Sequence, residues 1–114
     1  MDAFSALLTI KALDGLFQRS AVTAENVANA GSPNYRPLRV TFEQALTVAA
    51  GKGEAAVDSV QPKVEADPTV PRDEGLRLDL ELATSSSTAM RYAALIEVLN
   101  RQMQLNALAA TGNG

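Results

Sequence analysis

The chain has 114 residues, of which 46% are hydrophobic but only 4% are aromatic, and it contains neither cysteine nor histidine. Those two absences remove thiolate nucleophiles, disulfides, imidazole bases and most transition-metal ligands, so no catalytic, cofactor or metal site is expected and the chain is not expected to be an enzyme. The formal net charge of −3 argues against nucleic acid as a partner. The length corresponds to one small domain whose core would be marginal without a partner.

Residues 3–30 have the apolar periodicity of a long helix. Apolar side chains recur in steps of about four and three residues, the spacing of a coiled-coil seam. They are Ala6, Ile10, Leu13, Phe17, Ala24 and Val27. Gly15 lies inside this pattern and weakens an isolated helix by roughly 1 kcal/mol relative to alanine, which indicates a helix ordered by its neighbours.

A turn rich in Gly, Pro and Asn follows this helix. Gly31 is expected just past the helix end in the left-handed conformation. Pro33 fixes its own φ and Asn34 tolerates a positive φ, so the two are expected to form the centre of a tight turn. Tyr35 then leaves the turn either as an assembly contact or as a lid on a two-helix core.

Two asparagines, Asn26 and Asn29, precede the turn and are expected to point to the same side of the helix. They either fix the junction between helix and turn while bonding a neighbouring subunit, or cap exposed carbonyls locally.

The middle of the chain changes character twice. Leu38, Val40 and Phe42 alternate with polar residues as in a strand, and a short helix is expected over residues 42–50 with Thr41 as N-cap in a capping box. Residues 51–75 are interrupted by Gly and Pro and are acidic, so they are expected to contain no helix. Short strands around the isolated valines remain an alternative. We expect an extended, partly disordered arm that becomes ordered on a neighbouring molecule.

The last segment is the longest helix candidate, from Leu80 to about Ala110. Asp79 is the expected N-cap and Glu81 lies in the first turn. The serine run at residues 85–88 is expected to fray or restart the helix. One apolar face contains Tyr92, Ile96, Leu99, Met103 and Ala107, and a second contains Leu95, Val98 and Leu105.

These elements predict a mainly α fold in one structural domain. The parts are an N-terminal helix, turn and short helix (1–50), a flexible arm (51–78) and a C-terminal helix (79–114), with the two long helices paired as an antiparallel coiled-coil hairpin. Two apolar faces per helix exceed what one partner helix covers, so the surplus predicts contacts between subunits. The predicted assembly faces comprise Ile10, Leu13, Phe17, Tyr92, Leu95, Ile96, Leu99 and Met103.

Asn26-Val27-Ala28-Asn29, followed by Ser32-Pro33-Asn34-Tyr35, resembles the N-terminal signature of the flagellar rod, hook and hook-associated proteins. That signature reads Asn-aliphatic-Ala-Asn and then Thr-Pro-Gly-Tyr, so Ser32 and Asn34 are departures from it. The segments 39–46, 78–83, 89–95 and 99–102 are similar, in the same order, to the B-type basal-body rod protein. The block at 78–83 followed by Arg91-Tyr92 favours the B-type over the neighbouring C-type proximal rod subunit.

The resemblance implies a structural subunit of the proximal rod, which polymerises through its terminal helices into a hollow drive shaft. Its partners would be copies of itself, other rod subunits, inner-ring and rod-adapter proteins, and the export apparatus in transit. No run of about 20 apolar residues and no secretory signal is present, so the sequence by itself indicates a cytosolic protein without membrane insertion. The resemblance instead implies export to the periplasmic rod without a cleaved signal peptide.

Phe4 and Leu8 lie one helical turn apart and are similar to the element by which rod and hook proteins engage the export gate. The alternative for this candidate export element is an ordinary helical pair. The alternative for the whole chain is a helical-hairpin binding module that docks one partner.

Overall fold

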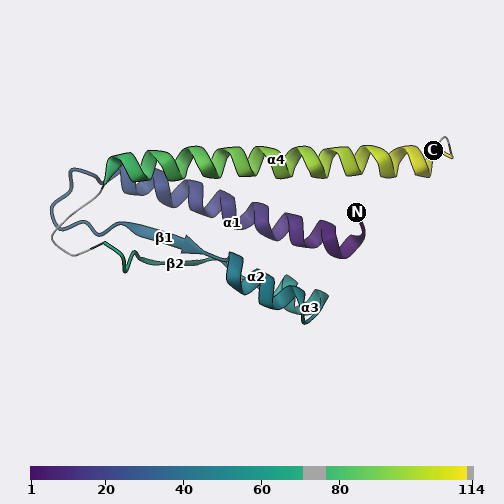
Figure 1. The fold of residues 1–114 in the computed structure, drawn as a ribbon, viewed down its shortest axis with the longest axis horizontal. Coiled ribbons are helices and arrows are strands. Elements are labelled where there is room, and N and C mark those ends of the chain that lie inside the picture. The colour runs from purple at the N-terminus through teal and green to yellow at the C-terminus, as the bar shows by residue number, and fades with distance from the viewer. Residues whose placement is uncertain (71–76, 113–114) are drawn as a thin grey trace.

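The computed structural model describes residues 1–70 and 77–112 of an elongated molecule measuring 61 × 27 × 14 Å (Figure 1). Long helices begin and end the chain, and a short helical and stranded unit lies between them in the sequence. In chain order the elements are α1 (Ala3–Ala28), β1 (Leu38–Thr41), α2 (Glu43–Ala50), α3 (Glu54–Asp58), β2 (Lys63–Ala66) and α4 (Leu78–Ala110).

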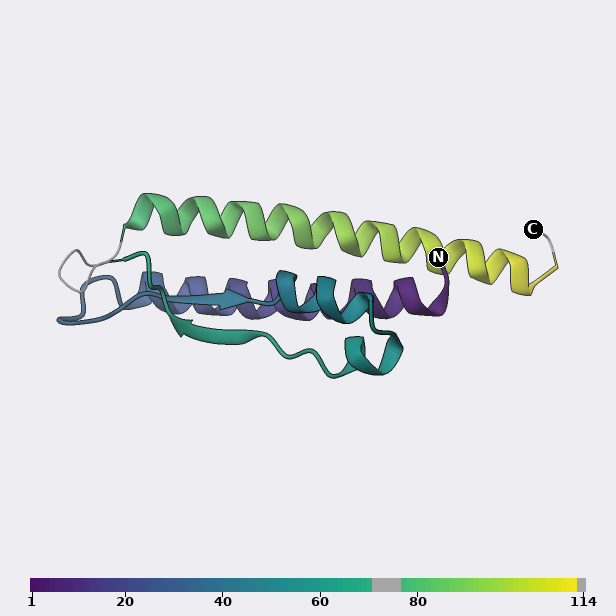
Figure 2. The same ribbon diagram turned by 60° about the horizontal axis from the view of Figure 1, so that its bottom comes forward.

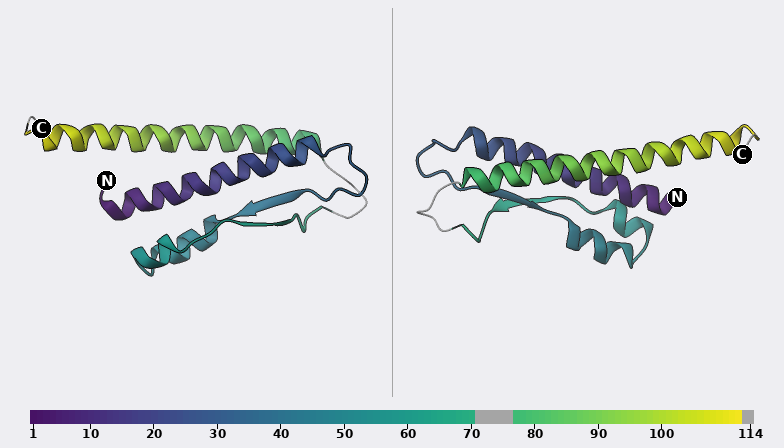
Figure 3. Two further views of the ribbon diagram at one scale, coloured as in Figure 1. Left: turned by 180° about the vertical axis from the view of Figure 1, so that it is seen from behind. Right: turned by 45° about the horizontal axis from the view of Figure 1, so that its top comes forward.

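The central element of the fold is α1. It packs against α4 on one side, where the two helices run in opposite directions, and against β1, α2 and α3 on the other (Figures 1 and 3). The expectation of a mainly helical fold with two long terminal helices packed on each other is therefore confirmed. Figure 2 shows that β2 lies on the outer side of β1, farther from α4.

The expectation that residues 51–75 contain no helix is wrong. Residues 54–58 form α3, which places Val57 in a fully buried position, and residues 63–66 form β2. Strand β2 pairs antiparallel with β1, with Val64 opposite Val40. Ala55 and Ala56 favour helix, but five residues are too few for a stable helix alone, and burial of Val57 supplies the missing stabilisation. The arm up to residue 70 therefore folds onto its own chain; residues 71–75 lie outside the described ranges.

Helix α4 begins two residues earlier than expected. Arg77 occupies the N-cap position and its side chain makes no capping hydrogen bond, whereas Asp79 lies inside the first turn and accepts from Arg77 Nη2 at 2.8 Å. Asp79 is therefore not the N-cap. The expected fraying or restart at residues 85–88 is wrong, because α4 continues through this run, with Thr88 buried and the three serines exposed. Burial of Thr88, together with the helix on both sides of the run, offsets the poor helix preference of the serines.

The core lies between α1, β1 and the start of α2. Buried Leu16, Val22, Val40 and Phe42 form its centre, and half-buried residues from the neighbouring elements pack around it. These are Ala12, Leu38, Leu46, Tyr92 and Leu95. Within residues 1–70 and 77–112, no helix contains an apolar stretch sufficient to cross a bilayer.

Phe42 takes the N-cap position of α2, so the capping box expected at Thr41 is wrong. The Phe42 ring instead lies directly on Gly15 of α1, where a Cβ atom would come within 2.4 Å of ring carbon Cδ1. Gly15 is the residue that lets this aromatic ring approach the helix backbone.

Candidate assembly interface and its supporting contacts

Asn26 is a buried polar residue whose side chain bonds several elements, and it is only 1% exposed. Its Nδ2 donates to the carbonyl oxygen of Leu38 at 2.8 Å and to Glu81 Oε2 at 3.1 Å. Its Oδ1 accepts from the Leu38 N–H at 2.9 Å and from the Tyr35 hydroxyl at 2.7 Å. These four bonds use both donors and both acceptor positions of the amide, and they join α1, the turn, β1 and α4.

Asn26 and Arg19, seven residues apart on α1, satisfy the edge of β1 that faces away from β2. Asn26 bonds both the N–H and the carbonyl of Leu38, as a residue of a neighbouring strand would. Arg19 Nη2 donates to the carbonyl oxygen of Val40 at 2.8 Å. A helix therefore covers a strand edge that would otherwise be open to pairing with other chains.

The structure confirms the tight turn predicted at Pro33 and Asn34, but not the left-handed conformation predicted for Gly31. The Tyr35 N–H donates to the Ser32 carbonyl at 3.3 Å, and Asn34 has a φ of 61°, so Pro33 and Asn34 form the expected tight turn. Gly31 is not left-handed, because the positive-φ glycines among the described residues are Gly53 and Gly112.

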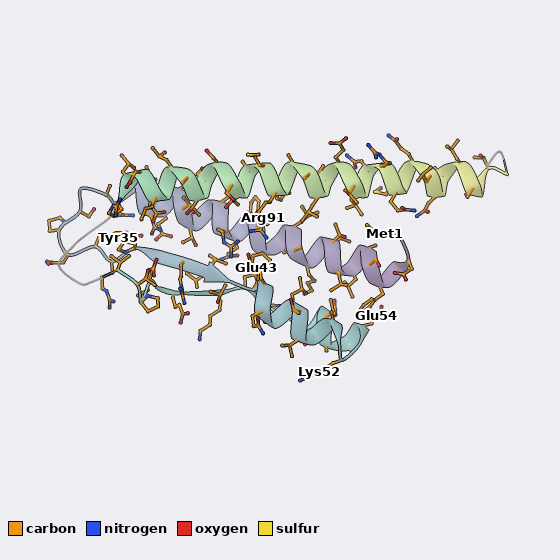
Figure 4. The ribbon with its side chains drawn as sticks, in the orientation of Figure 1. Met1, Tyr35, Glu43, Lys52, Glu54 and Arg91 are labelled. Atoms are coloured by element: carbon orange, nitrogen blue, oxygen red, sulfur yellow. The ribbon has the colours of Figure 1, made fainter. Side chains whose placement is uncertain are left out.

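The two motif asparagines do not act together. Asn29 is the C-cap of α1 and its Nδ2 donates to the Glu25 carbonyl at 2.9 Å, which is the local capping alternative. Asn26 instead fixes the junction between helix and turn, with all four partners inside its own chain. Tyr35 lies over that junction (Figure 4), where burial and the carboxylates of Glu25 and Glu81 raise the pKa of its hydroxyl.

A cluster of Arg19, Glu43 and Arg91 links α1, α2 and α4. The Arg19 guanidinium binds both carboxylate oxygens of Glu43 at 2.7 Å and lies over the Phe42 ring with its Cζ 4.9 Å from the centroid. Arg91 Nη1 approaches Glu43 Oε2 at 3.5 Å, and Figure 4 shows this pair between α2 and α4. Hydrogen bonding from Arg19 lowers the pKa of Glu43 to about 2, against a smaller opposing effect of burial.

This pKa shift predicts a loss of stability at acid pH. The carboxylate contributes stability above the ordinary pKa of 4.5, and that contribution disappears as pH falls toward about 2. Because the side chain is 44% exposed, we expect about 1 kcal/mol after solvent screening. Urea unfolding at a series of pH values should show a steeper loss between about pH 5 and pH 2 for the parent protein than for Glu43→Gln. Equal slopes would contradict the assignment.

The predicted assembly faces divide into two groups. Leu13 is buried, and Tyr92 and Leu95 pack against the core, so these three side chains lie within the chain's own packing. Ile96 and Leu99 are half-buried. Ile10, Phe17 and Met103 are exposed, with Phe17 at 66% and Met103 at 58%.

Apolar side chains remain exposed along the whole length of α4. They are Leu78, Leu80, Leu82, Met90, Val98, Met103, Leu105 and Leu108. The C-terminal part of α4 extends beyond the start of α1, and no other helix of the described residues lies alongside it there (Figure 1). Glu97 and Arg101 form an i,i+4 pair on the polar side of this helix at 3.5 Å.

Phe4 and Leu8, the candidate export element, are half-buried within α1, and Leu8 lines a groove between α1, α2 and α4. Sequence reasoning did not single out Arg19 or Glu43 as a pair. Their separation of 24 residues gives no local signal, although the heptad spacing of Arg19 from Asn26 marks them as residues of one helix face.

The fold defines only a class of protein: a mainly helical chain in which two long helices pack on each other, with a small two-stranded sheet beside them and exposed apolar side chains on α4. No protein-family model matches the chain, and no curated protein is significantly similar to it.

Proposed function

We propose that this protein is a structural subunit of the proximal rod of the bacterial flagellar basal body. It would polymerise into the hollow shaft that transmits motor torque. The observation that carries the proposal is the surface of α4, which presents eight large exposed apolar side chains on a helix of 33 residues. A monomer gains nothing from exposing them, whereas burial between neighbouring copies stabilises an assembly.

The local structure around the sequence motif supports the same proposal. Asn26 ties the end of α1 to the Tyr35 turn, to β1 and to Glu81 at the start of α4. A subunit that carries torque needs its two terminal helices held at a fixed mutual position, and a fully bonded buried amide provides that. We further propose that α1 and α4 continue as a coiled-coil hairpin in the assembly, where the apolar steps of both helices would meet neighbouring copies.

The partners in this proposal are copies of the same chain, other rod subunits, and the inner-ring and rod-adapter proteins. The protein would leave the cytoplasm through the flagellar export channel without a cleaved signal peptide. Phe4 and Leu8 are the proposed export element. The neighbouring C-type rod subunit is the alternative within the same assembly.

Deleting the gene in its host tests the proposal. Because every later axial structure grows on the proximal rod, electron cryotomography of intact cells should show inner rings without rod, hook or filament. Complete flagella in the deletion strain would contradict the proposal. They would favour a helical-hairpin binding module, which light scattering would detect as a discrete oligomer.

The exposed face of α4 can be tested by complementation of that strain. Met103→Asp is expected to abolish motility, because it places a charge in an interface between subunits while leaving the chain's own core intact. Gln104→Asp, on the polar side of the same helix, is the matched control and should restore swimming. If cells with Met103→Asp swim, the exposed face of α4 around Met103 does not lie in an interface between subunits.

A further inference from the structure

A groove with a volume of about 700 Å³ lies along α2 and α3. Its floor is apolar and contains Phe42, Ala45, Val48, Ala49, Ala56 and Val60. Val48 is 48% exposed although it belongs to this apolar set. The groove is therefore an incompletely covered apolar surface.

Lysines stand at both ends of this groove. Lys63 lies directly opposite Thr41, two residues before α2 begins, and Lys52 lies two residues after α2 ends. Lys63 Nζ lies 3.5 Å from Glu65, and Lys52 makes no ion pair within the described residues and points away from α1 (Figure 4). The lining contains no carboxylate, although the chain as a whole has a net charge of −3.

The outer face of α1 is apolar and acidic, so it complements the apolar groove and its lysines. Its exposed residues include Ile10, Phe17 and Ala21, with Asp14 and Glu25 beside them. Neither acid has an ion-pair partner among residues 1–70 and 77–112. The two acids are eleven residues apart, which is about 16 Å along a helix. Helix α2 is about 12 Å long, and the two lysines lie about two residues beyond its ends. The lysines are therefore separated by a distance similar to that between the two acids.

We propose that the outer face of α1 from one copy docks into the α2–α3 groove of a second copy. Phe17 would enter the apolar floor beside Val48, and Asp14 and Glu25 would meet the lysines at the two ends. The two surfaces differ, so the contact is heterologous and repeats from copy to copy. This inference specifies one contact of the assembly proposed above and rests on that proposal.

Charge distinguishes this occupant from the exposed apolar side chains of α4. Beyond Val98, α4 carries Arg101 and no acidic residue, so that part of the helix offers nothing to the lysines. At the other end of α4, Asp79 already pairs with Arg77 and Glu81 accepts from Asn26. The exposed face of α1 offers two carboxylates with the required separation. Complementary rim charges chiefly set register and partner choice, while burial of Phe17 supplies the apolar contact.

The absence of natural cysteines permits a direct test on the full chain. Tagged Val48→Cys protein is mixed at high concentration with untagged Phe17→Cys protein and treated with a short bismaleimide. We expect a cross-linked heterodimer, because the two positions lie side by side in the proposed contact. Leu108→Cys, which is similarly exposed on α4, replaces Phe17→Cys in the control mixture and should give only background.

Charge reversal provides a second test of the same contact. Lys52→Glu with Lys63→Glu in the tagged protein should reduce the cross-linked yield about tenfold. Adding Asp14→Lys and Glu25→Lys to the untagged Phe17→Cys protein should restore the cross-linked yield. A yield no higher than that of the Leu108→Cys mixture, or no response to charge reversal, would overturn the inference.

The two proposals fail in different ways. Complete flagella in the deletion strain would reject the rod function itself. If deletion abolishes the rod but Phe17→Asp still supports swimming, the rod function stands and the α1 contact is rejected.

Discussion

Replacing Asn26 with Asp is expected to lower the free energy of unfolding by about 4 kcal/mol. The substitution changes no volume, but it replaces the Nδ2 donor by an oxygen that faces the carbonyl of Leu38 and the carboxylate of Glu81. A buried charge would then lie against two acceptors with no donor to compensate. Urea unfolding followed by far-UV circular dichroism measures the loss.

The same substitution at Asn29 is the matched control. Asn29 bonds only its own helix end and Ser32, so Asn29→Asp should cost at most about 1 kcal/mol. The penalty at Asn26 should also shrink at acid pH, since a protonated carboxyl regains a donor. Similar penalties at the two positions would mean that Asn26 is not the buried polar residue described above.

Gly15→Ala is expected to destabilise the protein by about 2 kcal/mol, opposite in sign to the usual effect of this change within a helix. The new methyl group would lie 2.4 Å from the Phe42 ring, which is held by the core and by Arg19. The ring must move, and its packing on Leu16 and Val40 is then lost. Thermal or urea unfolding of the variant measures the effect.

Two further variants make this prediction specific to the ring. Gly31→Ala has open space around the new Cβ and no positive φ to violate, so it should be neutral or slightly stabilising. Phe42→Leu in the Gly15→Ala background removes ring atoms from the contact and should recover part of the loss. A stabilising effect of Gly15→Ala alone would show that helix preference outweighs the ring contact.

The long helices and the turn between α1 and β1 are the parts that local sequence predicts well. Apolar steps of three and four residues recur over more than twenty residues in each helix, so the signal accumulates. Pro33 and Asn34 restrict their own backbone angles, so the turn needs no distant partner. Gly31 differs because glycine permits the left-handed conformation without requiring it.

The candidate site was predictable only in outline. The sequence motif marked Asn26 and Asn29 as a pair, but whether an amide is buried depends on which elements cover it. The strand edge at Leu38 and the carboxylate of Glu81 come from 12 and 55 residues away, and they separate the two asparagines. The predicted apolar faces had the same difficulty, since periodicity identifies a face but not its occupant.

By itself, the sequence determined that this protein builds two long helices, that a tight turn follows the first of them, and that it has no residues for thiol, imidazole or disulfide chemistry. Periodicity, backbone restriction and composition are local properties, so they can be read without a fold. Only the tertiary structure decided that residues 54–58 form a helix, that Gly15 admits the Phe42 ring, and that Leu13 and Leu95 are covered while Phe17 and Met103 are not. Those outcomes depend on burial against residues distant in sequence, which no local pattern records.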